Sequence, residues 1–125
     1  MIETVMIVGQ DDLSIYNIAN LVEAAFPGCR VLFASSISQA YRILSAAGHL
    51  DFIIASWSLG EFSGFDIAEL AQVRDIPILI SDCSQEEFLD EAPVHSTVGH
   101  LEDGFDVGDL RNIYFEVLES RYEEI

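Results

Sequence analysis

Short apolar runs alternate along the chain with segments whose apolar residues recur every three or four positions. The first run, Thr4–Val8, precedes a glycine and is typical of a strand buried on both faces of a parallel sheet. From Leu13 to Phe26 the apolar spacing predicts an amphipathic helix, which a Pro-Gly pair ends. Five such units follow one another. Their predicted strands are Thr4–Val8, Arg30–Ala34, Asp51–Ala55, Ile76–Ile80 and Thr97–Leu101.

Several of the predicted helices have suitable start and stop residues. Asp12 offers an N-cap for the first helix, Ser36 caps the second, which Gly48 ends, and Asp106 caps the last. The third and fourth are short, over residues 65–70 and 86–91. Alternating buried strands and amphipathic helices imply right-handed crossovers and a parallel sheet covered on both faces. The sequence therefore predicts a doubly wound α/β fold, with a site beyond the carboxyl ends of its strands.

The length and composition fit a single compact domain. The chain has 125 residues, half of them hydrophobic, and we expect a domain over residues 1–122 with a tail at 123–125. It contains no apolar run of about 18 residues, and Glu3 stands where a signal peptide would be basic, so we expect a cytoplasmic protein. Cys29 and Cys83 show no zinc-ligand spacing and are predicted to be reduced thiols.

The charge of the chain is strongly negative and uneven. It has 22 acidic residues against 5 basic ones, a formal net charge of −17, and all five basic residues are arginines. Residues 51–125 hold eighteen of the acids and three of the arginines. Binding to a phosphate backbone requires Lys and Arg side chains, so direct nucleic-acid binding is disfavoured. The acidity indicates either simple solubility or a partner with a basic surface.

Three segments carry a resemblance to a known family. They are the stretch 51–67, with a Ser-Gly pair that opens the third helix; Ile76-Pro77-Ile78-Leu79; and Gly104-Phe105-Asp106 before the last helix. Together with the five-unit pattern, they resemble the response-regulator receiver family over nearly the whole chain. The resemblance implies a flavodoxin-like sheet of five parallel strands in the order 2-1-3-4-5.

The resemblance also places the family's phosphorylation pocket on this sequence. In that family an acidic pair after the first strand binds Mg²⁺, and an aspartate ending the third strand accepts the phosphoryl group. A hydroxyl after the fourth strand and a lysine after the fifth hold its oxygens. By position the acidic pair corresponds to Gly9 and Gln10, and only the following Asp11 is acidic. The acceptor corresponds to Ser56 and the lysine to Asp103. The hydroxyl corresponds to Asp82 or, with a one-residue slip, to Ser81.

Each of these substitutions removes a physical requirement for phosphoryl transfer. A glycine and a neutral amide supply too little charge to hold Mg²⁺, which dehydrates reluctantly. A serine hydroxyl without a base is a weak nucleophile. The chain has no lysine at all, and Asp103 would repel a phosphoryl group. We therefore expect a pseudo-receiver that is not an enzyme and has no catalytic residue, metal or cofactor.

Two other chemistries remain open at this edge of the sheet. Asp11, Asp12, Asp82 and Asp103 should all face it, where carboxylates either take up a cation such as Ca²⁺ or Mg²⁺ or are solvated. Ser56 could pair with His49, His95 or His100 in a hydrolase, but the sequence lacks a G-x-S-x-G pattern. We expect these loop carboxylates to be solvated and the protein not to be a hydrolase.

The resemblance also implies a partner-binding face, formed by the fourth helix, fifth strand and fifth helix. Residues 82–125 contain thirteen acids and two arginines. His100 lies three residues before the lysine position, where the family has an aromatic that moves on phosphorylation, and it adds a titratable group there. The predicted face residues are Glu86, Glu87, Phe88, Asp109, Tyr114 and Glu116.

These observations support one leading function and two alternatives. The leading interpretation is an atypical receiver domain in two-component or phosphorelay-type signal transduction that binds a protein independently of phosphorylation. Its partner would be a basic protein surface or a second copy, with no direct nucleic acid and no membrane. One alternative is an acidic decoy that occupies a nucleic-acid-binding protein. The other is a receiver switched by a cation or small ligand in the altered pocket.

Overall fold

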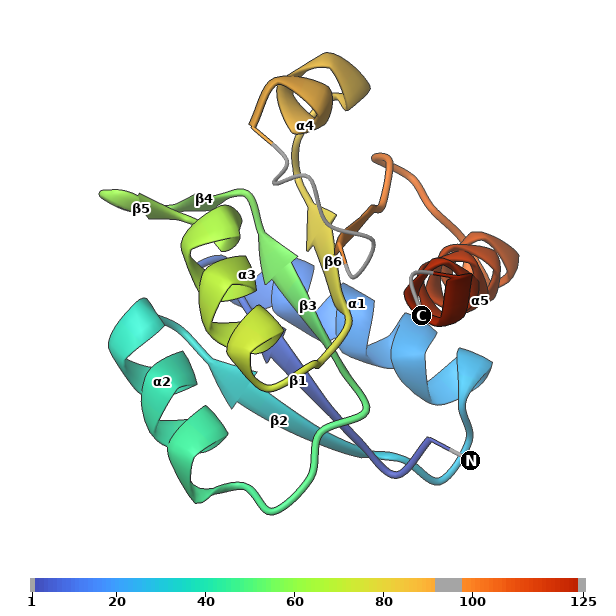
Figure 1. The fold of residues 1–125 in the computed structure, drawn as a ribbon, viewed down its shortest axis with the longest axis horizontal. Coiled ribbons are helices and arrows are strands. Elements are labelled where there is room, and N and C mark those ends of the chain that lie inside the picture. Colours follow the sequence, from blue (N-terminus) through green and yellow to red (C-terminus); the bar gives the residue numbers. More distant parts are fainter. Residues whose placement is uncertain (1, 92–97, 124–125) are drawn as a thin grey trace.

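The computed structural model describes residues 2–91 and 98–123, which surround a parallel sheet of five strands (Figure 1). The strand order is β2-β1-β3-β6-β7, so the predicted sheet and its order are confirmed. Every pair of neighbours is parallel. The strands are β1 (Thr4–Val8), β2 (Arg30–Ala34), β3 (Phe52–Ser56), β6 (Ile78–Ser81) and β7 (Val98–His100).

Helices cover both faces of this sheet, as a doubly wound fold requires (Figure 1). Val5 and Ile7 face the layer of α1 (Asp12–Ala25) and α5 (Val107–Glu123). The alternate residues of the same strand, such as Met6, face α2 (Ile37–Ala46) and α3 (Gly64–Val73). All five residues of β3 are buried, because both of its faces are covered.

The helix starts follow from local side-chain hydrogen bonds. Ser36 caps α2 as predicted, accepting from the backbone N–H of Gln39 at 3.2 Å. Ser63 and Asp66 form a capping box at α3. The first helix begins one residue earlier than the sequence predicted, so Asp11 and not Asp12 is its N-cap. Unlike the caps of α2 and α3, Asp11 makes no side-chain hydrogen bond to a backbone N–H group of its helix, and such boundaries shift by a residue easily.

The loop after β3 contains an unpredicted hairpin. Its strands are β4 (Ser58–Leu59) and β5 (Phe62–Ser63), which pair antiparallel and project from the molecule (Figure 1). Gly60, at φ 72°, supplies the left-handed conformation of the tip. The fourth helix, α4 (Gln85–Glu91), is short, as expected. The predicted strand residue Thr97, and residues 124–125 of the predicted tail, lie outside the described residues.

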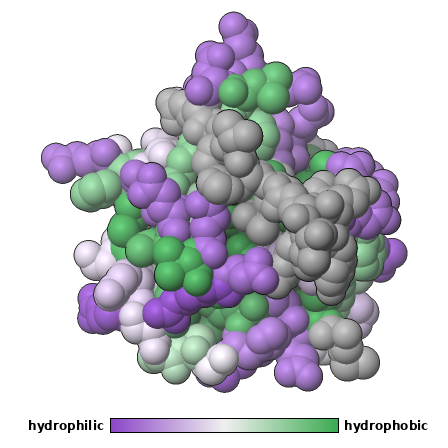
Figure 2. Space-filling model, in the orientation of Figure 1, coloured by the Kyte–Doolittle hydropathy of each residue, from purple (hydrophilic) through white to green (hydrophobic). Residues whose placement is uncertain are grey.

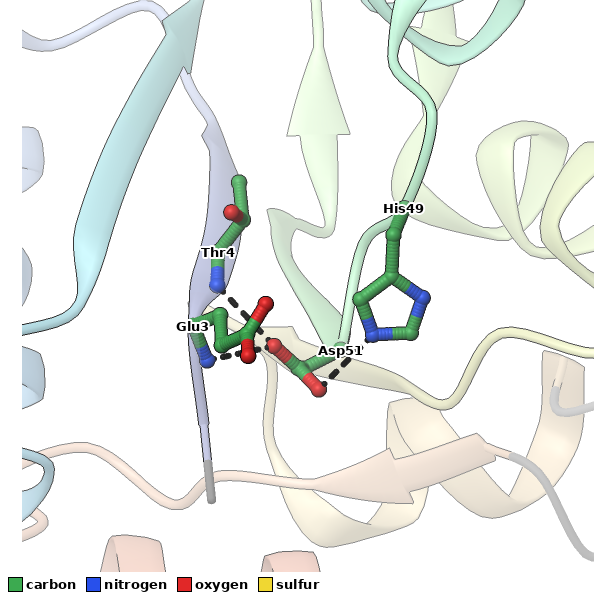
Figure 3. Close-up of polar contacts among 4 residues, drawn as sticks. All are labelled: Glu3, Thr4, His49 and Asp51. Carbon is green, nitrogen blue, oxygen red and sulfur yellow. Dashed lines mark hydrogen bonds and ion pairs between the residues drawn. The ribbon is translucent and has the colours of Figure 1, made fainter.

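The opposite, amino-terminal edge of the sheet is tied together by Asp51. Its carboxylate accepts hydrogen bonds from the backbone N–H groups of Glu3 at 2.7 Å and Thr4 at 2.9 Å, and it pairs with the His49 ring at 3.1 Å (Figure 3). Burial alone would raise the pKa of Asp51, but these hydrogen bonds outweigh it and lower the pKa below its usual value. The start of β1 is thereby held against the segment entering β3. Of the described helices, none is both long and apolar enough to cross a membrane.

Candidate functional site

Beyond the carboxyl ends of β1, β3 and β6 lies a cavity of about 230 Å³. It forms here because parallel strands direct the loops that follow them to one edge of the sheet. The loop after β1 and the last residue of β3 supply half of the polar side chains that line it. Of the residues assigned to the pocket from the sequence, those lining the cavity are Gly9, Gln10, Asp11, Ser56 and Asp82.

A hydrogen bond between Ser56 and Asp82 closes one side of this crevice. The Ser56 hydroxyl donates to the Asp82 carboxylate at 2.9 Å, and the carbonyl oxygen of Ser58 lies 3.3 Å from the same hydroxyl. Asp82 has φ 63°, a left-handed conformation that aspartate tolerates better than most residues. Ser56, which the resemblance predicts at the phosphoryl-accepting position, is therefore already hydrogen-bonded to a carboxylate.

Ser81 does not share this crevice. It pairs in register with Ser56 across β3 and β6, is 2% exposed, and has no hydrogen-bond partner for its hydroxyl among the described residues. Asp82, which contacts Ser56, is the residue in the pocket. Of the two residues proposed for the family's hydroxyl position, Asp82 lines the crevice and Ser81 does not.

The crevice carries negative charge and no positive side chain within the described part of the chain. Asp11 accepts a hydrogen bond from the Ser14 hydroxyl at 2.7 Å, which lowers the pKa of Asp11 and keeps it ionised. Two of the arginines donate elsewhere, Arg74 to the carbonyl of Leu44 and Arg111 to that of Ala25. An entering phosphate would therefore meet two carboxylates and no cation, which is an unfavourable field.

The alternative chemistries find little support in this geometry. Among the described residues, no three His, Cys, Asp or Glu side chains gather as ligands for a metal ion. Asp12 lines neither this cavity nor the groove described next, and Asp103 lines only the groove. His49 lies at the other edge of the sheet, while His95 lies outside the described residues.

A larger groove of about 610 Å³ runs between α4, β7 and α5. Part of its floor is apolar, including Phe88 on α4 and Ile113 on α5. Figure 2 shows mainly hydrophilic side chains over the end of the molecule that carries α4, with a hydrophobic spot among them. Acidic residues from the loop after β7 and from α5 line the rest: Glu102, Asp103, Asp109 and Glu116.

His100, which the resemblance predicts at a switch position, makes two contacts in this groove. Its Nε2 atom lies 2.8 Å from the carbonyl oxygen of Cys83, and since a carbonyl only accepts, this nitrogen carries the proton. Its ring stacks on Phe88 with centroids 4.9 Å apart. Phe88 in turn contacts Phe65, with centroids 5.8 Å apart, at the start of α3. A row of three rings thus joins the groove to the helix that follows the crevice.

The first residues of α3 pack directly against the end of β3. A Cβ atom added at Gly64 would lie 2.6 Å from the carbonyl oxygen of Ser56, too close for any other residue without movement. The Ser-Gly pair noted in the sequence therefore sets how closely α3 approaches the crevice.

The predicted partner-face residues divide into three groups. Phe88, Asp109 and Glu116 line the groove, whereas Glu86 is exposed outside it. The predicted place of Tyr114 on the face is wrong: it is 6% exposed, and its ring packs against Phe26 and Phe52 between α5 and the sheet.

Two acids of the predicted face also cap helices. Glu87 accepts from the backbone N–H of Ser84 at 3.0 Å, which lowers the pKa of Glu87. The Asp109 carboxylate accepts a hydrogen bond from the backbone N–H of Asp106 at 3.0 Å, and the Asp106 carboxylate accepts one from the backbone N–H of Asp109 at 2.8 Å. Neutralising either residue would weaken a helix start as well as reduce the surface charge.

Sequence reasoning missed several residues of these sites. Ser14 and Ser58 line the crevice, and Gln85 and Asn112 line the groove. The helical spacing of Asn112 from Asp109 and Glu116 could have placed it on the same stripe of α5. Ser58 gives no such signal, because it belongs to the short hairpin.

Comparisons with family models and with curated protein sequences find no match. Solved structures, however, share the fold. A response regulator receiver protein from Sinorhizobium medicae superposes with a TM-score of 0.79 at 17% identity, over 96% of this chain and 97% of that one. A CheY-like receiver domain protein from Methanospirillum hungatei gives 0.71 at 15%, over 98% and 99%. The anti-anti-sigma factor PhyR from Bartonella quintana gives 0.80 at 20%, over 99% of this chain and half of that one.

Proposed function

We propose that this chain, which has the fold of response-regulator receiver domains, is a cytoplasmic signalling module that works without phosphoryl transfer. It catalyses no reaction and acts by binding a protein partner. The single observation that carries the proposal is the Ser56–Asp82 hydrogen bond at 2.9 Å, in a crevice that no described Lys or Arg lines.

The chemistry of phosphoryl transfer supports this reading of the crevice. The reaction needs a cation to neutralise charge on the transferring group, and fixed carboxylates to hold that cation. Here Gly9 and Gln10 follow β1, and Asp11 is bound to Ser14. The Ser56 hydroxyl has a carboxylate beside it, which is a much weaker base than an imidazole, and no histidine lines the crevice among the described residues. As far as the structure describes it, the crevice thus has no acidic pair directly after β1, no acceptor aspartate at the end of β3 and no positive side chain.

The contacts of His100 support a switch position that is fixed and not phosphorylation-dependent. The ring is bonded to the Cys83 carbonyl and stacked on Phe88. Holding one rotamer by two contacts lowers the population of any alternative. We therefore propose that the groove between α4, β7 and α5 stands ready for a partner without activation.

Incubation with acetyl phosphate and Mg²⁺ tests the first part of this proposal. We expect no added phosphate by mass spectrometry of the intact protein, and no change in amide spectra with beryllofluoride. A receiver domain that carries the acceptor aspartate, treated in parallel, supplies the positive control. A covalent phosphate on Ser56, or at any other residue of the crevice, would show that phosphoryl transfer persists and would refute the proposal.

An acidic decoy is a second candidate, favoured by the net charge of −17. A decoy would occupy the basic surface with which its partner binds DNA or RNA. Competition separates the two functions: a decoy bound to its partner is displaced by nucleic acid, whereas a signalling module bound elsewhere on the partner is not. The partner used is the one recovered with the intact protein from its source cells.

A further inference from the structure

The outer edge of β2 carries backbone groups that pair with no strand in the described structure. β2 stands at one end of the strand order and pairs only with β1 (Figure 1). The Arg30 N–H donates to the residue before β1 at 2.7 Å, and the Ala34 carbonyl accepts from the residue after β1 at 3.0 Å. Successive residues of a strand direct their backbone groups to opposite sides. The N–H and C=O groups of Val31 and Phe33 therefore point away from β1.

The open part of this edge is short and apolar. The N–H groups on either side of it are bonded locally, that of Cys29 to the Phe26 carbonyl at 3.3 Å and that of Ser35 to the Gln39 side chain at 2.7 Å. Between them, β2 contains no proline, no acid and no bulge, the features by which proteins usually block pairing at a sheet edge. The Phe33 side chain is 52% exposed. This edge is therefore open to a further strand.

The region around β2 also differs in charge from the rest of this acidic chain. Residues 24–50, which include β2 and α2, contain two arginines and no aspartate or glutamate. β7, the other edge strand, borders the acidic groove and stands at the opposite end of the strand order. Four strand spacings of about 4.8 Å separate the two edges by about 19 Å, more than twice the screening length of about 8 Å at physiological salt. Two copies can therefore meet at β2 with less repulsion than at β7.

The edge of β2 is complementary to itself. If a twofold axis passes beside Leu32, Val31 of one copy lies opposite Phe33 of the other, and each such pair exchanges two backbone hydrogen bonds. The two strands then form four hydrogen bonds in an antiparallel register. The two Leu32 side chains meet on the face covered by α2, and each Phe33 lies beside a Val31 on the other face. No carboxylate stands on either strand.

We propose that two copies of this chain associate edge to edge through β2 and join their five-stranded sheets into one continuous sheet. The backbone hydrogen bonds fix the register, and the apolar side chains of residues 31–33 add contact area. The crevice and the groove are formed by other strands and stay open in this dimer. The dimer thus goes beyond the proposed function and does not depend on the absence of phosphoryl transfer.

Sedimentation equilibrium of the intact protein tests for the dimer, and amide hydrogen exchange locates it. We expect the dimer fraction to rise with protein concentration, and exchange at Val31 and Phe33 to slow as it does. Added NaCl should strengthen the association, because two chains of net charge −17 repel each other less when screened. An association with a basic surface would respond to salt in the opposite direction.

Two pairs of variants separate pairing at β2 from contact elsewhere. Val31→Pro removes an outward N–H while leaving the bonds to β1 in place, and Val31→Thr keeps this N–H as its control. Phe33→Glu adds a carboxylate beside the open edge. Its control is Phe115→Glu on α5, since the two phenylalanines are 52% and 51% exposed.

We expect Val31→Pro to weaken the dimer about tenfold or more, because two of its four hydrogen bonds are lost, and Val31→Thr to change it by less than about threefold. Phe33→Glu should weaken it about tenfold and Phe115→Glu by less than about twofold. If Val31→Pro does not fold, the glutamate pair decides. A protein that stays monomeric at all concentrations, or a dimer that is lost in Phe115→Glu and kept in Phe33→Glu, would overturn the inference. Neither outcome alters the acetyl phosphate result.

Discussion

Two serines that face each other across neighbouring strands differ in what their hydroxyls contact. Ser56 and Ser81 are Cα partners in the pairing of β3 with β6, and both are buried. Ser56 donates to Asp82, whereas no described atom bonds to the Ser81 hydroxyl. A buried hydroxyl without a partner has lost its bonds to water and gained nothing in return. We therefore expect the Ser56 hydroxyl to stabilise the folded protein and the Ser81 hydroxyl to destabilise it.

Replacing each serine by alanine tests this difference. We expect Ser56→Ala to lower the free energy of unfolding by about 1 kcal/mol, since a bonded hydroxyl is lost. Ser81→Ala should raise it, by roughly 0.5–1 kcal/mol, since an unsatisfied polar group is removed. Urea denaturation at neutral pH measures both, and each variant serves as the control for the other. A loss of stability in Ser81→Ala would mean that its hydroxyl has a partner, for example a bound water.

At the scale of the elements, local sequence patterns predicted the five principal strands and their helices. Each depends on a periodic run or a cap within a few residues, such as the buried residues of β3 or the Ser36 cap of α2. The hairpin β4–β5 was missed because strands of two residues have no periodicity. The apolar spacing of the last helix does predict burial of Tyr114, since Leu110, Tyr114 and Val117 fall on one helical face, and its place on the partner face was an expectation from the resemblance.

For the candidate site, the sequence could predict some of the residues that come together but not the contacts between them. Strand ends in a parallel sheet meet at one edge, so Gly9, Ser56 and Asp82 could be placed together from the sequence. The bond from Ser56 to Asp82 could not, because it depends on the left-handed backbone of Asp82. The separation of Asp103 from the crevice also could not be predicted from the sequence, because it is set by the course of the loop after β7.

The connection between β1 and the start of β3 should depend on pH. Asp51 has a lowered pKa in the folded protein, so its contribution to stability is present above its unfolded pKa, about 3.9, and is lost as pH falls through the folded value. Asp51→Asn should lower the free energy of unfolding by about 1 kcal/mol or more at pH 7, where charged hydrogen bonds are lost. The difference from the unaltered protein should shrink at pH 3.

Urea denaturation at pH 7 and pH 3 avoids the region near the isoelectric point of about 4.1, where solubility is lowest. Glu69→Gln, an exposed acid on α3, is the matched control and should show no such pH dependence. A penalty for Asp51→Asn that is equal at both pH values would mean that the carboxylate's charge does not stabilise this edge.

The whole molecule carries a formal net charge of −17, and its sequence contains no lysine. Repulsion among like charges is strongest in the compact state, because folding brings them closer together. Salt screens this repulsion over about 8 Å at physiological ionic strength. Stability should therefore respond to ionic strength in general and not to a particular cation.

Raising NaCl from about 0.05 to 0.5 M should increase the melting temperature by roughly 5 °C, the equivalent of about 1 kcal/mol for a domain of this size. MgCl₂ or CaCl₂ at matched ionic strength should give no larger increase, since no ligand set gathers among the described residues. Differential scanning calorimetry measures both. A further rise at millimolar divalent cation would demonstrate a specific metal site and reinstate a cation-switched receiver.

The central place of β1 in the sheet has a consequence for the route of folding. Because β1 pairs with both β2 and β3, residues 4–56 form a contiguous three-stranded unit. Residues 1–56 carry five of the 22 acids and two of the five arginines, so they can collapse with little mutual repulsion. The acidic remainder must then dock β6, β7 and α5 onto a formed template. We therefore expect the kinetic barrier to fall on the charged half of the chain, and salt to speed the late docking step more than the early collapse.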